Sequence, residues 1–153
     1  LGSLDYNARN IVVDERTSRP SFIEFAKVGW DWPERRLVQY ATSLGSGRTD
    51  FVGLITPDTA RLYAARKPGD AGRLFALDGH HMLFHLNASA MLARAFEEPE
   101  KAANRALLQV WRRPRHRLRQ LVHALATPLS DDPQCTELRG AIGEFASAAQ
   151  RGA

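Results

Sequence analysis

The segment Pro20–Leu44 reads PSFIEFAKVGWDWPERRLVQYATSL and contains the residues on which the predicted fold depends. Its first part, residues 21–26, is apolar enough for a strand, yet it carries Glu24 in the middle and is followed by Lys27. A helix is predicted to begin at Pro33, because proline suits the first helical position. The apolar stripe of this helix consists of Leu37, Tyr40, Ala41 and Leu44. A strand followed by a helix indicates a mixed α/β region.

Four further segments of the first half are predicted to be strands, because they are short, rich in apolar residues and bounded by turn residues. They are residues 11–13, 51–55, 60–64 and 73–77. The first of them is expected to form a hairpin with residues 21–26. A turn centred on Thr17 and Ser18 would place Glu24 opposite Ile11 in that hairpin.

The second half of the chain has helical patterning. The segment 80–86 is ambiguous between strand and helix, and Asn87 can cap a helix that follows it. Helices are predicted over residues 87–96, 99–113, 114–127 and 132–150. We therefore expect an α/β (α+β) fold. Residues 1–86 would form a small mixed β-sheet with hairpins and a flanking helix, and residues 87–153 would form a helical region packed on the same domain.

Three stretches of the first half follow one another in the order found in a known superfamily. They read FIEFAK at residues 22–27, RRLVQYA at residues 35–41 and FVGLITPDTARLYAA at residues 51–65. In this order the chain resembles the PD-(D/E)xK nucleases, especially the nuclease-like domains of type I restriction subunits and related defence proteins. The resemblance covers roughly half of the chain and implies a restriction-endonuclease-like fold.

The resemblance also implies a catalytic site for phosphodiester cleavage. Such a site holds Mg²⁺ through carboxylate oxygens, and the ion activates a water and stabilises charge on the phosphate. Glu24 matches the second acidic position of the superfamily, and Asp5 or Asp14 would supply the first. Asp5 is preferred, so Asp5 and Glu24 are the candidate metal ligands, with Mg²⁺ as the candidate cofactor. Lys27 would help to position the nucleophile.

The lysine of this motif is displaced. The superfamily places lysine two residues after the glutamate, because alternate side chains of a strand share a face. Ala26 occupies that position here, and Lys27 would point to the other face unless a β-bulge restores it. The motif is therefore expected to be degenerate. The structural alternative for Glu24 is a strand-edge glutamate paired with Arg35 or Arg36.

Positive charge is concentrated in one segment of the chain. The formal net charge is +4, but residues 101–129 contain seven lysines and arginines and no acidic residue, which leaves −3 on the remainder. Five arginines fall within eight residues, and they are predicted to contact nucleic acid or another polyanion: Arg112, Arg113, Arg115, Arg117 and Arg119. The alternative is a solvated face balanced by acidic residues that bracket it, Glu97, Glu98, Glu100, Asp131 and Asp132.

Histidine and tryptophan residues near these segments have ordinary explanations. His81 and His85 would share one face of a helix or strand, whereas His80 would point elsewhere. No third ligand follows at a suitable spacing, so a zinc site is not expected. Trp30 and Trp32 flank the start of a helix, and packing in the core or as a hydrophobic staple is expected for them ahead of base stacking.

The remaining composition fits a reducing compartment, so an intracellular location, cytoplasmic or nuclear, is expected. The single cysteine, Cys135, excludes an intrachain disulfide and is expected to be a partly buried thiol. No apolar run approaches the roughly 18 residues that span a bilayer, so no membrane partner is expected. Leu1-Gly2-Ser3 resembles the remnant of a cleaved affinity tag, which predicts that the natural segment begins near Leu4 and belongs to a longer protein.

Three functions are compatible with these features. The first is a nuclease-like domain with a degenerate motif that binds nucleic acid or another polyanion, and this is the function we expect. The second is an active Mg²⁺-dependent nuclease. The third is a protein–protein interaction module, with a partner protein or a second copy of the chain as its target and no role in nucleic-acid binding.

Overall fold

The computed structural model describes residues 2–3, 10–23, 28–43, 55–66, 72–111 and 113–152. These residues form six helices and four short strands. The helices are α1 (Pro33–Ser43), α2 (Pro57–Ala65), α3 (Gly72–Glu97), α4 (Ala102–Val110), α5 (Pro114–Ala126) and α6 (Pro133–Gly152). The strands are β1 (Gly2–Ser3), β2 (Ile11–Val13), β3 (Pro20–Phe22) and β4 (Val28–Gly29), and they form two antiparallel pairs, β1 with β4 and β2 with β3.

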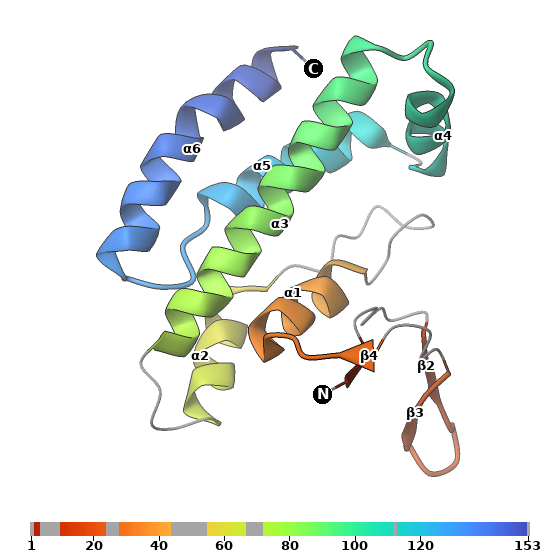
Figure 1. Cartoon of the computed structure of the whole chain (residues 1–153), viewed down its shortest axis with the longest axis vertical. Coiled ribbons are helices and arrows are strands. Elements are labelled where there is room, and N and C mark those ends of the chain that lie inside the picture. Colours follow the sequence, from red (N-terminus) through yellow and green to blue (C-terminus); the bar gives the residue numbers. More distant parts are fainter. Residues whose placement is uncertain are drawn as a thin grey trace.

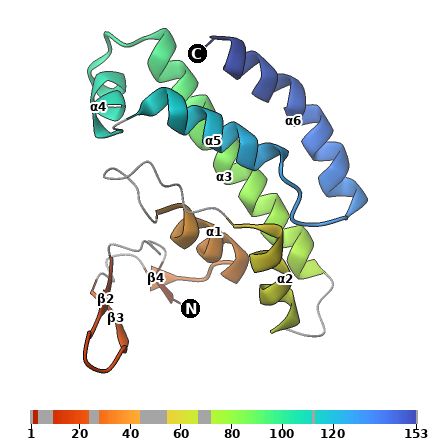
Figure 2. The same cartoon turned by 180° about the vertical axis from the view of Figure 1, so that it is seen from behind.

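The long helix α3 is the element around which the other helices are arranged. Helices α1, α2, α4, α5 and α6 all contact it. Figure 1 shows α3 running diagonally through the molecule with α6 along one side, and Figure 2 shows α5 packed across it from behind. Helices α1 and α2 lie against its N-terminal half, and α4 lies at its C-terminal end. Within the described part of the chain, no helix is long and apolar enough to cross a membrane.

The expected α/β fold is wrong, because segments predicted to be strands are helical. Residues 60–64 lie in α2, and residues 73–77 open α3, which continues through residues 80–86. Asn87 lies inside α3 and does not cap a helix. The expected boundary between residues 86 and 87 therefore falls in the middle of one continuous helix. Most of the predicted strand 51–55 lies outside the described residues.

Local sequence signals explain why α2 is a helix. The Oγ1 atom of Thr56 accepts a hydrogen bond from the backbone N–H of Thr59 at 3.2 Å, which is an N-cap, and Pro57 occupies the first turn. Ala60 faces the core and is fully buried. The alternation of polar and apolar residues at 60–64 resembled a strand, but this cap and the burial of one helical face decide the structure.

Three apolar clusters join the helices to α3 along its length. Leu77 packs with residues of α1 and α2, Leu92 with residues of α5, and Met82 with residues of α5 and α6. Helix α3 therefore connects the packing of α1 and α2 in the first half of the chain with the packing of α5 and α6 in the second half. Burying each of these large side chains contributes roughly 1.5–3 kcal/mol.

The hairpin predicted between residues 11–13 and 21–26 is confirmed, but its register differs from the expected one. Ile11 pairs with Phe22 and not with Glu24. The turn is closed by the carbonyl of Asp14, which accepts the backbone N–H of Ser18 at 2.8 Å, and Ser18 has a left-handed backbone with φ of 54°. Most side chains of the hairpin are exposed, so it contributes little to the helical core.

Candidate nucleic-acid interface

Helix α5 presents a basic face to solvent. Arg115, Arg119 and His123 follow one another at intervals of four residues, which places them on one side of the helix, and all three are exposed. The opposite side carries the buried leucines Leu118 and Leu121, which pack on α3. Burial of the leucine side therefore fixes the direction in which the basic residues point. We call Arg115, Arg119 and His123 the α5 basic face.

Arg113 extends this positive surface at the start of α5, next to Arg115. Arg113 occupies the N-cap position of the helix and is exposed. The guanidinium of Arg115 lies over the ring of Phe96, 5.6 Å from its centroid, which restrains the side chain beside the C-terminal end of α3. Arg119 forms no ion pair within the described part of the chain. Arg112 lies outside the described residues.

Arg117 differs from the other arginines of the cluster because its side chain belongs to the core. It is only 7% exposed, and its guanidinium lies over the ring of Trp111 at 4.4 Å from the centroid. Burial lowers the pKa of Arg117 to about 10, which still leaves it protonated at neutral pH. Arg117 was predicted to contact a polyanion together with its neighbours, but its buried side chain is not part of the α5 basic face.

The acidic residues that bracket the segment lie at the end of α3, in the turn before α4 and just before α6. The Oε1 atom of Glu98 lies 2.7 Å from Nζ of Lys101, so Glu98 neutralises the charge of Lys101 just before α4. Glu97 and Glu100 are exposed in the turn that connects α3 to α4. Asp132 accepts the backbone N–H of Gln134 and so serves the start of α6. The whole of α5 lacks an acidic residue, so its exposed side is cationic.

The residues predicted for nuclease chemistry are not brought together in the described structure. Asp5, Glu24 and Lys27 lie outside the described residues. The Oδ1 atom of Asp14 accepts the backbone N–H groups of Arg16 at 2.8 Å and Thr17 at 2.9 Å, and these bonds lower the pKa of the Asp14 carboxyl. Asp14 is thus an exposed turn residue, and the described residues do not build the Mg²⁺ site that the resemblance implies.

A row of buried polar side chains on α3 was not predicted as a group. Asp78, His81, His85 and Ser89 recur at helical spacing and are each no more than 1% exposed. The prediction that His81 and His85 share one face is confirmed, because their ring centroids lie 4.3 Å apart. The Nδ1 atom of His85 is 2.8 Å from the carbonyl oxygen of His81. Asp78 and Ser89 follow the same helical spacing as the two histidines. The spacing was not recognised, because residues 73–77 were predicted to be a strand and not the start of this helix.

The electrostatics of this row are set mainly by burial. Burial lowers the pKa of His81 to about 3, with further contributions from His85 and Arg139, and burial also lowers the pKa of His85. Both rings are therefore neutral at physiological pH. Within the described part of the chain, no group of three or more His, Cys, Asp and Glu side chains could hold a metal ion.

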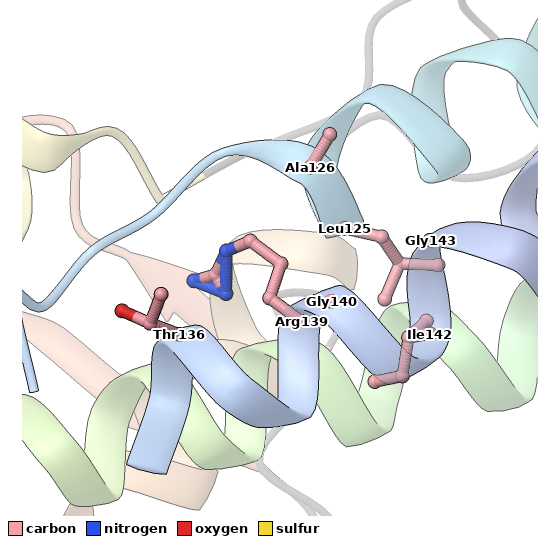
Figure 3. A pocket seen from close by; sticks show the side chains of 7 residues that line it. All are labelled: Leu125, Ala126, Thr136, Arg139, Gly140, Ile142 and Gly143. Atoms are coloured by element: carbon pink, nitrogen blue, oxygen red, sulfur yellow. The ribbon is translucent and has the colours of Figure 1, made fainter. Parts of the chain in front are cut away.

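Asp78 is the one carboxylate in this row, and it is paired. The Nη2 atom of Arg139 on α6 lies 2.7 Å from both carboxylate oxygens, and the backbone N–H of Ser130 donates to Oδ2 at 3.1 Å. Beside this pair, a pocket of about 310 Å³ opens between α5 and α6 (Figure 3). Its lining residues are Leu125, Ala126, Thr136, Arg139, Gly140, Ile142 and Gly143. Apolar and small residues dominate it, so it does not extend the α5 basic face.

Comparison with protein families, with curated proteins and with solved structures finds no match to this chain. The resemblance to PD-(D/E)xK nucleases therefore stays a prediction from the motif residues alone. The helical fold also does not supply the strand at 60–64, which belongs to one of the three stretches that carry the resemblance.

Proposed function

We propose that this chain is a helical module that binds nucleic acid through the α5 basic face. The observation that carries the proposal is the exposure of Arg115, Arg119 and His123 on the side of α5 that has no acidic residue. Arg113 adds a further exposed cation at the start of the same helix. Arginine suits this role because its planar guanidinium donates two parallel hydrogen bonds to a phosphate.

Phosphate contact of this kind has a recognisable physical signature. Each cation that neutralises a phosphate releases condensed counterions, so the affinity falls steeply as salt is added. A helix whose buried side is fixed by leucines presents its arginines without a large loss of backbone freedom on binding. The proposal requires no catalytic group, and it assigns the chain a binding role.

Reversing two charges of the α5 basic face should weaken binding. In Arg115→Glu with Arg119→Glu, attraction to phosphate is replaced by repulsion, and the affinity for a labelled nucleic acid is expected to fall at least about tenfold. Fluorescence anisotropy measures this, and circular dichroism checks that the helices persist. The matched control is Arg61→Glu with Arg66→Glu, which changes the net charge equally at two exposed arginines of α2 and the residue after it. Equal weakening by both double variants would contradict the proposal.

Single substitutions can separate Arg117 from the α5 basic face. Arg119→Met removes an exposed charge and should lower the affinity by about fivefold, since a charge-assisted contact contributes roughly 1 kcal/mol or more. Arg117→Met removes a charge that lies against Trp111 in the core and should leave the affinity within about twofold. The same anisotropy titration compares the two. A larger loss from Arg117→Met than from Arg119→Met would show that the wrong arginines have been assigned.

A further inference from the structure

Two tryptophans are exposed where the chain enters α1. Trp30 is 86% exposed and Trp32 is 62% exposed, so the expectation that they pack in the core is wrong. Tryptophan is usually largely buried, because its ring has a large apolar surface. The Trp32 ring keeps one contact with the fold, because its centroid lies 6.2 Å from that of the His80 ring of α3, and most of its surface stays open to a ligand.

Trp32 is part of the wall of a pocket between the N-terminal ends of α1 and α3. The pocket has a volume of about 540 Å³, which is in the usual range for small-ligand sites. Helix α1 and the residue before it contribute Trp32, Pro33 and Glu34, and α3 contributes Gly72, Arg73, Phe75 and Ala76. Phe75 is 40% exposed, so two aromatic rings are accessible in or beside this pocket.

A buried carboxylate provides the polar part of the pocket. Glu34 is only 2% exposed although it lines the pocket. Its Oε1 atom accepts hydrogen bonds from the hydroxyl of Tyr63 at 2.7 Å and from Nη1 of Arg73 at 3.2 Å. The site therefore combines flat apolar walls with one fixed acceptor and one fixed guanidinium.

We infer that this pocket takes an unpaired base of a single-stranded nucleic acid. The inference rests on the proposed function, since the α5 basic face would hold the phosphates of the same strand. A nucleobase has a flat π-face that can stack on Trp32 and Phe75. Its edge carries N–H groups that Glu34 can accept and acceptor atoms that Arg73 can reach. A base inside a duplex cannot enter, because both of its faces are already stacked.

The position of the pocket indicates a strand that spans much of the molecule. Phe75 begins the stretch of α3 that ends beside Arg115, at Phe96. That stretch is about 30 Å long at the helical rise of about 1.5 Å per residue. A bound strand therefore has to be several nucleotides long to reach both regions, which suits the site sizes of single-strand binders.

The first test uses the unaltered protein. Three labelled probes are titrated by anisotropy at one salt concentration: a single strand of roughly 20 nucleotides, an abasic strand with the same number of phosphates, and the corresponding duplex. The base-bearing strand is expected to bind about tenfold more tightly than the abasic strand, because stacking is lost in the latter. Equal affinity for these two strands would overturn the inference.

The second test asks whether Trp32 is the residue responsible. Trp32→Ala is expected to lower the affinity for the base-bearing strand about tenfold and to leave the abasic strand unaffected, while Trp32→Phe keeps most of the affinity. Trp30→Ala is the control, because Trp30 is more exposed than Trp32 but does not line the pocket. An equal loss from Trp30→Ala and Trp32→Ala would overturn the assignment to the pocket.

The two proposals fail in different ways. If base-bearing and abasic strands bind equally and Arg115→Glu with Arg119→Glu weakens both, the α5 basic face stands and the base pocket is refuted. If no probe binds, including the duplex and the abasic strand, both the proposed function and the base pocket are refuted.

Discussion

Arg139→Met is expected to lower the free energy of unfolding by about 3–5 kcal/mol at neutral pH. The substitution leaves Asp78 fully buried without its ion pair, and the hydrogen bonds that remain come from neutral groups such as the backbone N–H groups of Leu129 and Ser130. Burial already raises the pKa of Asp78 despite Arg139, so the carboxylate depends on its partner. Urea denaturation followed by circular dichroism gives the free energy of unfolding.

Two variants control for this result. Arg61→Met breaks the exposed ion pair of Arg61 with Asp58 and should cost less than about 1 kcal/mol. Adding Asp78→Leu to Arg139→Met removes the stranded carboxylate and should recover much of the stability, because apolar side chains can replace a buried ion pair. A loss from Arg139→Met no larger than that from Arg61→Met would mean that Asp78 is not buried in solution.

The free energy of unfolding is expected to fall as the pH is lowered from about 6.5 to about 4, by roughly 1.4 kcal/mol per pH unit from His81, which stays neutral in the folded chain over this range. The pKa of His81 is lowered to about 3 from its ordinary value of 6.5, and that of His85 is lowered as well. In this window the unfolded chain binds protons that the folded chain does not, so stability is lost as the pH falls. Urea denaturation at several pH values measures the slope.

The groups around His81 and His85 favour this direction. Arg139 on α6 and Arg117 on α5 are positive, and each lowers the pKa of one of the two rings. Asp78 acts in the opposite direction, because burial raises its pKa and the folded state takes up that proton at a higher pH than the unfolded state.

A variant identifies His81 as the source of the slope. His81→Leu keeps a side chain of similar bulk without a titrating group, and the slope between pH 6.5 and 4 should fall by roughly 1.4 kcal/mol per pH unit. Asn87→Leu places the same residue on the exposed side of α3 and serves as the control. If His81→Leu and the unaltered protein lose stability in parallel as the pH falls, the buried, neutral state of His81 is refuted.

The helices with strong local signals could be predicted from the sequence. The start of α1 at Pro33 and of α5 at Pro114, and the positions of α4 and α6, follow from proline and from apolar periodicity. The error lay at residues 60–64 and 73–77, where short apolar runs are compatible with either structure. Burial of one helical face helped to decide both segments, since Ala60 of α2 and Leu77 of α3 lie in one cluster with Val38 of α1. Such contacts between distant parts of the chain are not visible in a single sequence.

The candidate site was predictable only in part. The charge of residues 112–119 was evident, but the sequence could not show that Arg117 turns inwards onto Trp111 while Arg115 and Arg119 face solvent. Exposure of Trp32 was missed because tryptophan beside a helix start usually packs. The Asp78–Arg139 pair joins residues 61 positions apart, and no local signal connects them.

The central claim is that the α5 basic face binds the phosphates of nucleic acid, and its most direct test is the salt dependence of binding. The affinity for a labelled single strand is measured across a salt series for the unaltered protein and for Arg115→Glu with Arg119→Glu. The slope of log affinity against log salt should become shallower by roughly 1.4 in the variant, since each lost phosphate contact removes about 0.7. An unchanged slope would contradict the claim.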